Sequence, residues 1–338
     1  MEGRIRVKVD IIGAGALGLL FGGKLAAGGA RVRFWTRTLE QARLLAGEGI
    51  QVEEPHSGLM SIAPSMILAH PVDDIVGGSL NITEEERPDW IFITTKQRSV
   101  DHDLLEFVGR IAGPKTGIVC FQNGIGHIEM FQSVFKDRSI YVAVTTEGAK
   151  RGDARSVIRS GAGTTQIGIP QPSEFLLYND DSLDERKEQI REEDLLKMLE
   201  SAGFEAFLSK DIDREIYRKL LINAVINPLT AIWRIPNGEL LDTESRIVML
   251  RQLCEEGMRI YAAHQIPIPS NMYEQIVSVC RSTAGNTSSM LSDVLKGAPT
   301  EIDSINGRLV KLAQAASIPA PGHEMVWRLV RGLEATGV

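Results

Sequence analysis

Hydrophobic residues in the first 210 positions gather in short runs that alternate with helix-length segments. Short runs rich in apolar residues occupy residues 7–12, 31–35, 88–95 and 116–121, and those at 88–95 and 116–121 are continuous enough to be typical of parallel strands buried on both faces. Segments rich in helix-forming residues follow these runs and end near residues 27, 46, 111 and 131. The alternation predicts an α/β domain with a parallel-rich sheet.

Additional short elements complete this first part of the chain. Strands are expected at residues 140–146, 156–159, 164–169 and 204–209, with a helix at 192–201, and these would finish the domain's sheet. Residues 50–52 and 59–62 indicate a short hairpin. Residues 171–193 are crowded with acidic side chains and predict a solvated loop or helix face without a catalytic role.

The pattern becomes purely helical from residue 211 onward. Helix-length stretches punctuated by prolines occupy residues 215–232, 243–264, 271–283, 302–316 and 323–333. We therefore expect two domains, an α/β domain at residues 1–209 and an all-helical domain at residues 210–338.

The first strand runs directly into a glycine motif that ends inside the first helix. Its residues are Gly13, Ala14, Gly15, Ala16, Leu17 and Gly18, a G-x-G-x-x-G sequence. A strand that turns into a helix on this sequence presents backbone N–H groups and the positive end of a helix dipole to a pyrophosphate. The motif predicts a Rossmann-type dinucleotide site, the alternative being an ordinary glycine-rich turn.

The residue that follows the second strand bears on cofactor choice. NAD-preferring sites carry an acidic residue about 20 residues after the glycines, whereas this strand continues into Thr36-Arg37-Thr38. A guanidinium suits a 2′-phosphate, so Arg37 favours NADP(H) over NAD(H). The alternative is that Arg37 is a solvated loop cation.

Two polar residues follow later strands of the predicted sheet. Lys96 comes after the run at 88–95, and Asn123 comes after the run at 116–121. Ligands of open α/β sheets bind at the carboxyl ends of the strands, so both residues are expected at the crevice of the glycine turn. Taken singly, Lys96 is better explained as a solvated lysine and Asn123 as a turn asparagine.

One helix of the second domain carries a polar stripe. Lys219, Asn223 and Asn227 recur every four residues and therefore share one face of an otherwise apolar helix. Burial lowers the pKa of a lysine and makes it a competent general acid toward a carbonyl, while asparagines bind hydroxyl and carboxylate oxygens. In the alternative interpretation, Lys219 snorkels to water and the asparagines bond to neighbouring backbone.

Composition and charge exclude several classes of protein. The 338 residues are 43% apolar and 24% charged, which suits a globular protein with two cores. The net charge of −7 argues against a nucleic-acid surface. No apolar run approaches the roughly 18 residues of a membrane span, and Cys120, Cys254 and Cys280 form no metal or disulfide pattern. We expect a cytoplasmic protein without a metal, and the sequence leaves open whether the protein forms a homodimer.

Seven blocks in order along the chain resemble the ketopantoate (2-dehydropantoate) reductase family. They are Gly13 to Gly18, Lys96, Asn123-Gly-Ile-Gly126, Lys219-x3-Asn223-x3-Asn227-Pro-Leu-Thr-Ala-Ile-Trp233, Pro236-Asn-Gly-Glu-Leu240, Asn286-Thr-Ser-Ser-Met-Leu291 and Thr300-Glu-Ile-Asp-x-Ile-Asn-Gly307. The resemblance implies NADPH-dependent reduction of 2-dehydropantoate to (R)-pantoate, a step that feeds pantothenate and coenzyme A.

The resemblance also implies roles for individual residues. Lys219 would be the proton donor, with Glu301 beside the nicotinamide. Without the resemblance, Glu301 is better explained as a first-turn helix residue that follows a Thr300 cap. Lys96 and Asn123 would lie between nicotinamide and substrate, Ala149 would lie beside the cofactor, and Arg37 would meet its 2′-phosphate. The residues expected to hold the substrate are Asn123, Lys219, Asn223, Asn227, Asn237, Asn286 and Ser289.

Two other functions stay open at this stage. One is a related enzyme that reduces a different branched 2-oxo acid with the same lysine and asparagines. The other is a non-catalytic NADPH-binding sensor that grips a partner with its helical domain. Retention of Lys219 and Glu301 speaks against the sensor, which has no need of a proton donor.

Overall fold

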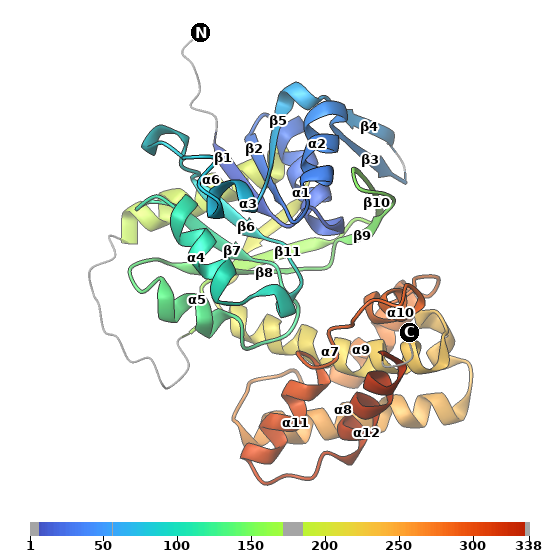
Figure 1. Cartoon of the computed structure of the whole chain (residues 1–338). Helices are drawn as coiled ribbons and strands as arrows, with labels where there is room; N and C mark the ends of the chain where they lie inside the picture. The colour runs from blue at the N-terminus through green and yellow to red at the C-terminus, as the bar shows by residue number, and fades with distance from the viewer. Residues whose placement is uncertain (1–6, 56, 172–184, 335–338) are drawn as a thin grey trace. The chain divides into compact units, whose positions relative to one another are not determined.

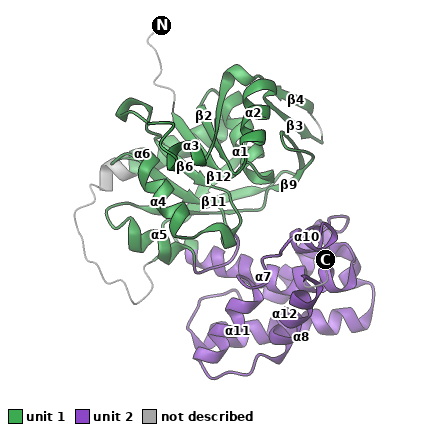
Figure 2. Ribbon diagram, viewed as in Figure 1, with its two compact units in different colours: residues 1–122, 127–212 green, residues 123–126, 213–338 purple. Residues whose placement is uncertain are grey.

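The computed structural model describes residues 7–55, 57–171 and 185–334 in two compact units (Figure 2). The first unit comprises residues 1–122 and 127–212, and the second comprises residues 123–126 and 213–338. A single cut near residue 210 would leave the short segment 123–126 with the first unit, whereas its contacts group it with the helical unit. Most of the acid-rich stretch at 171–193 lies outside the described residues, and its described end begins helix α6.

The first unit is built on an eight-stranded sheet in the order β12-β11-β8-β7-β6-β1-β2-β5 (Figure 1). All neighbouring pairs are parallel except β8 with β11, which is antiparallel. The strands are β1 (Lys8–Ile12), β2 (Arg31–Thr36), β5 (Ile67–Pro71), β6 (Trp90–Ile93), β7 (Gly117–Cys120), β8 (Ile140–Thr145), β11 (Thr164–Gly168) and β12 (Glu205–Leu208). The predicted parallel-rich α/β architecture is confirmed.

A second sheet of four strands departs from the expected arrangement. Its order is β4-β3-β10-β9, and its strands are β3 (Ile50–Glu54), β4 (Gly58–Ile62), β9 (Gly148–Arg151) and β10 (Ser156–Gly161). The prediction that the strand at 156–159 completes the main sheet is wrong, because β10 pairs in parallel with β3 of the hairpin. The mixed burial along β10 suits a sheet with one covered face.

Helix α1 (Ala16–Ala27) packs against both sheets. A Cβ at Gly22 would clash with the Phe34 ring of β2, and one at Gly23 would touch Val52 of β3. Burial on two sides explains why the helix is apolar almost all round. Its one charged residue, Lys24, is buried and pairs with Glu54 of β3 at 2.6 Å. The helix that carries the glycine motif is therefore held from both faces.

The remaining helices of the first unit connect its strands. They are α2 (Leu39–Glu48), α3 (Asp73–Val76), α4 (His102–Ile111), α5 (Ile128–Val134) and α6 (Glu185–Ser201). The sequence pattern predicted α2 and α4 but missed α3, which is a single turn. It also missed strands β5 and β9, whose short half-exposed sequences carry little periodicity.

The second unit is helical, as expected from the sequence. Its helices are α7 (Ile212–Trp233), α8 (Glu244–Ala263), α9 (Met272–Ser282), α10 (Ser289–Leu295), α11 (Asn306–Ala315) and α12 (Pro321–Glu334). The core of this unit gathers around α7, whose residues Leu221, Ala224 and Val225 are fully buried. The periodicity missed α10, and it placed the start of α11 at residue 302, where the structure has turns before Asn306.

Segment 123–126 joins this helical unit through specific contacts. Ile125 packs against its core. Gly126 has a φ of +103°, and a Cβ built on it would lie 2.5 Å from the guanidinium of Arg308 on α11. Only glycine suits such a backbone conformation and such a close approach. The loop after β7 is thus structurally part of the second unit.

Candidate active site

The glycine turn between β1 and α1 has the geometry that a dinucleotide cradle requires. Gly13 has a φ of +103°, and a Cβ on Gly18 would lie 2.0 Å from the carbonyl oxygen of Gly13. Apart from atoms of its chain neighbours, no atom of the described residues lies within 4 Å of the position that a Cβ on Gly15 would take. Gly15 is the N-cap of α1 and offers no side chain to its first N–H groups. Those donors and the space above Gly15 suit a phosphate group.

Two residues that the sequence reasoning missed hold this turn in place. The Thr94 hydroxyl lies within hydrogen-bonding distance of the carbonyl oxygens of Gly13, at 2.7 Å, and Ile12, at 3.1 Å. Gln41 of α2 donates to the carbonyls of Ala14, at 2.9 Å, and Ala154, at 2.7 Å. No motif in the sequence marks either residue, because both contacts join segments that lie far apart along the chain.

Parallel register brings the expected polar residues of the first unit to one sheet edge. Ile12 of β1 pairs with Trp35 of β2 and with Ile93 of β6, so the chain segments after these strands leave the sheet at the same level. Arg37 follows β2 and is exposed, and Lys96 follows β6 and is half-buried. Both therefore lie at the edge from which the glycine turn emerges.

Ala149, the remaining residue predicted for the cofactor in this unit, lies on β9. It is half-buried and packs against the core of the first unit. Just before this strand, the buried Glu147 accepts two hydrogen bonds from Arg159 of β10, at 2.7 and 2.6 Å. This charge-assisted pair fixes the approach to β9, and the sequence alone did not reveal it.

Helix α7 carries Lys219, Asn223 and Asn227 on successive turns, as the spacing predicted. Asn227 is buried, while Lys219 and Asn223 are half-buried. Burial lowers the pKa of Lys219 from 10.5 to about 8, and the nearby charge of Glu301 opposes this shift in part. An ammonium group with this pKa is poised to give up its proton near neutral pH.

Glu301 and Asn123 meet within the same unit. Asn123 donates a hydrogen bond from Nδ2 to Oε2 of Glu301 at 3.2 Å, across 178 positions of sequence. Glu301 is buried and precedes a series of turns, because α11 begins only at Asn306. Lys219, Glu301 and Asn123 thus form one polar group in the helical unit.

The other predicted substrate residues of this unit lie around the 3-10 turn at Asn237–Leu241. Asn237 is buried and donates from Nδ2 to Oγ1 of Thr283 at 2.9 Å, while its backbone N–H donates to the Asn286 carbonyl at 3.0 Å. Its Oδ1 is buried without a hydrogen-bond partner among the described residues. The side chains of Asn286 and Ser289 are exposed. Asn237 and Asn286 are therefore brought together, through their backbones.

Ser288, next to the predicted Ser289, has a structural task that the sequence did not reveal. Its hydroxyl accepts a hydrogen bond from the N–H of Leu291 and so caps α10. It also lies 2.7 Å from the hydroxyl of Thr230 on α7. The bond fastens α10, and with it Ser289, to the helix that carries the polar stripe.

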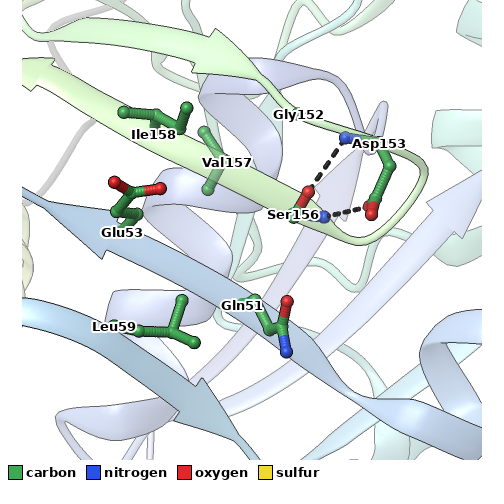
Figure 3. A pocket seen from close by; sticks show the side chains of 8 residues that line it. All are labelled: Gln51, Glu53, Leu59, Gly152, Asp153, Ser156, Val157 and Ile158. Atoms are coloured by element: carbon green, nitrogen blue, oxygen red, sulfur yellow. Dashed lines mark hydrogen bonds between the residues drawn. The ribbon is translucent and has the colours of Figure 1, made fainter.

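A surface hollow on the small sheet contains none of these residues. Figure 3 shows the side chains that line it, among them Gln51, Glu53 and Leu59. Asp153 and Ser156, on its rim, exchange hydrogen bonds with each other's backbone N–H groups at 2.7 and 2.9 Å. These polar groups complete a turn, so the hollow shows no group prepared for chemistry.

Among the described residues, no helix combines the length and the apolar composition that crossing a bilayer requires.

Comparison with known proteins agrees with the geometry. Residues 9–172 match the sequence family described as ketopantoate reductase PanE/ApbA, and residues 211–334 match ketopantoate reductase PanE/ApbA C terminal. A 2-dehydropantoate 2-reductase of Listeria innocua is 30% identical over 332 residues, which cover 97% of this chain and 97% of that protein.

Solved structures share the fold of this chain. A probable 2-dehydropantoate 2-reductase of Bacillus subtilis is 29% identical with a TM-score of 0.75, covering 97% of this chain and 100% of that one. D-mandelate dehydrogenase, solved with NADH and anilino(oxo)acetate, shares the fold with a TM-score of 0.81 at 22% identity, covering 98% and 99% of the two chains. On the sequence matches, which span nearly the whole chain, this protein belongs to the ketopantoate reductase family.

Proposed function

We propose that this protein is a 2-dehydropantoate 2-reductase that reduces 2-dehydropantoate to (R)-pantoate with NADPH, in the cytoplasmic synthesis of pantothenate and coenzyme A. The observation that carries the proposal is Lys219, a lysine whose pKa burial lowers to about 8 on a helix face shared with Asn223 and Asn227. Family membership supports the choice of substrate.

The residues of the first unit fit a bound dinucleotide. The open position above Gly15 and the first N–H groups of α1 would hold its pyrophosphate, and Arg37 would bind a 2′-phosphate through its guanidinium. Lys96 and Ala149 would contact the nicotinamide half. The bound cofactor supplies a hydride to the substrate carbonyl carbon.

The helical unit would supply the acid and the substrate contacts. Lys219 donates its proton to the carbonyl oxygen as negative charge develops there, a contribution of about 10² to 10⁴ in rate. Asn123 is oriented by its hydrogen bond to Glu301, which in turn keeps negative charge near the ammonium. Glu301 would form the catalytic pair with Lys219, and Asn123 would contact the cofactor and the substrate.

Substrate oxygens would be held by asparagines and a serine of the same unit. The buried Oδ1 of Asn237 has no partner among the described residues, and such an acceptor costs about 1 to 3 kcal/mol. A substrate hydroxyl would satisfy it. The full set of residues expected to contact the substrate is Asn123, Lys219, Asn223, Asn227, Asn237, Asn286 and Ser289.

A second candidate is a reductase of another 2-oxo acid. Its support is the fold shared with D-mandelate dehydrogenase, whose solved complex contains NADH and anilino(oxo)acetate. The absence of an acidic residue at the end of β2, where Arg37 stands, favours NADPH instead. The pantoate precursor and the phosphorylated cofactor are accordingly the first pair to test.

The test follows NADPH oxidation at 340 nm with a panel of 2-oxo acids. We expect kcat/KM to be highest for 2-dehydropantoate, and we expect Lys219→Ala to lose most of kcat while still binding NADPH in a fluorescence titration. Lys296→Ala, which removes an exposed lysine of the same unit, is the matched control. Turnover of Lys219→Ala at the wild-type rate would refute the role of the lysine. If the protein bound NADPH but did not oxidise it in the presence of any 2-oxo acid, the result would instead favour a non-catalytic sensor.

A further inference from the structure

Helix α7 contains a proline within its length, between the turns that carry the polar stripe. Pro228 lies inside the helix, which nevertheless continues to Trp233. Proline has no N–H, so the carbonyl of Ala224, four residues earlier, lacks the donor that residue 228 supplies in a regular helix. Ala224 is fully buried, so water does not provide a substitute.

The side chain of Asn306, the first residue of α11, supplies a donor at this point. Its Nδ2 donates to the carbonyl of Ala224 at 2.9 Å, and Asn306 is itself fully buried. The orientation of the amide follows from its neighbours, because a carbonyl oxygen accepts only from the nitrogen side. Asn306 therefore takes the place of the N–H that Pro228 lacks.

His323 of α12 fixes the same amide from the other side. Its Nδ1 lies 3.1 Å from Nδ2 of Asn306, and its Nε2 lies 3.0 Å from the carbonyl oxygen of Leu253 on α8. Nδ1 faces a donor and Nε2 faces an acceptor, so the ring is the neutral tautomer that carries its proton on Nε2. Burial lowers the pKa of His323 to about 4, which keeps the ring neutral at physiological pH.

A glutamate completes the connection between helices. Glu256 of α8 is buried and accepts hydrogen bonds from the N–H groups of Gly322, at 3.1 Å, and His323, at 2.7 Å, in the first turn of α12. Four helices, α7, α8, α11 and α12, are thus joined through buried polar contacts. The contacts meet α7 at Ala224, between Asn223 and Asn227.

We infer that Asn306 is a positioning residue that replaces the missing N–H of Pro228 and holds Asn223 and Asn227 in register with Lys219. The inference rests on the proposed function only in that the two asparagines bind the substrate. The repair of the helix itself is independent of the reaction. Asn306 lies five residues after Glu301 in the sequence, yet it acts through α7 and has no assigned contact with substrate.

A double-mutant cycle between Asn306 and Pro228 tests the inference. Asn306→Leu keeps a side chain of similar size but leaves the Ala224 carbonyl without a donor. Pro228→Ala gives residue 228 its own N–H. We expect Asn306→Leu to raise the KM for 2-dehydropantoate about tenfold with little change in the Kd for NADPH, since a lost buried hydrogen bond corresponds to changes of this size. The double variant is expected to regain most of the lost affinity.

Hydrogen exchange of the backbone amides at residues 224–227 and 229–232 gives a readout that does not require turnover. Exchange is expected to be faster in Asn306→Leu and to return toward the wild-type rate in the double variant. Thermal stability is expected to recover only in part, because Nδ1 of His323 still lacks its donor. Independent effects of the two substitutions on both KM and exchange would overturn the inference. If the wild type reduced no oxo acid, the proposed function would fail, and coupled exchange would still support the helix repair.

Discussion

The pKa of Lys219 makes a quantitative prediction about the pH dependence of catalysis. Moving this pKa from 10.5 to about 8 disfavours the ammonium form by roughly 3 kcal/mol. A proton donor must be protonated before the reaction, so kcat/KM should be level below about pH 7 and fall tenfold per pH unit well above pH 8. An ordinary solvated lysine would keep the rate level to about pH 10.

Substitution of Glu301 tests the cause of this behaviour. The negative charge of Glu301 raises the pKa of Lys219, while burial lowers it more strongly. Glu301→Gln removes the charge and keeps the shape, so the alkaline limb should move to lower pH. The assay is kcat/KM for 2-dehydropantoate from pH 6 to 10 in buffers of constant ionic strength, since this ratio reports groups of the free enzyme.

Exposed Lys296 again provides the control, because Lys296→Ala should leave the profile in place. A wild-type profile that stays level to pH 10 would refute the assignment of Lys219 as the acid. If the wild-type kcat/KM falls above pH 8 as expected but Glu301→Gln leaves that profile unchanged, the electrostatic coupling between Glu301 and Lys219 is refuted, while Lys219 remains the acid. The two results therefore separate the identity of the acid from the origin of its pKa.

Three other predictions concern the cofactor turn and the buried histidine. Arg37→Ala should reduce the preference for NADPH over NADH about 10- to 100-fold in kcat/KM, and an unchanged ratio would exclude Arg37 from 2′-phosphate binding. Gly18→Ala should lower the free energy of unfolding by about 1 to 3 kcal/mol, because its Cβ would lie 2.0 Å from the Gly13 carbonyl oxygen. Gly15→Ala should instead weaken NADPH binding and leave the Tm unchanged. Equal Tm values for the two variants would contradict this distinction. Because the pKa of His323 is about 4 in the folded protein and 6.5 when unfolded, only the unfolded chain takes up its proton as pH falls from 6.5 toward 4. Wild type should then lose about 2 to 3 kcal/mol more stability than His323→Gln between pH 7 and 4.5 in urea titrations, and parallel curves would show that His323 protonates freely when folded.

Local pattern was sufficient for the elements with a strong signal. The short apolar-rich runs predicted β1, β2, β6 and β7, and the runs of β6 and β7 are continuous because a strand buried on both faces leaves little room for polar residues. The same reasoning failed for β10, which was assigned to the wrong sheet. Its alternating burial is shared by many strands, and the partner β3 lies about 100 positions away. Periodicity identifies a strand but does not select its neighbour.

The candidate site divides in the same way. The glycine motif and the four-residue spacing on α7 are local features, and the structure has the predicted turn and the predicted helix face. Thr94, Gln41 and Glu147 were missed, since each acts on a residue remote in sequence or by a contact that no motif encodes. The roles of these three residues are revealed only by the distances between atoms in the folded protein.

The sequence by itself determined most of the strands and helices, the glycine turn, the face of α7 that carries the lysine, and the resemblance to a reductase family. Spacings of a few residues are enough for the elements, the turn and the helix face, because backbone geometry repeats every two or every 3.6 residues, whereas the resemblance rests on seven blocks along the chain. Tertiary structure alone decided that Asn123 meets Glu301, and that Asn306 provides the donor that Pro228 lacks. It also decided the acidity of Lys219, because desolvation depends on every segment packed around a side chain and not on its neighbours in sequence.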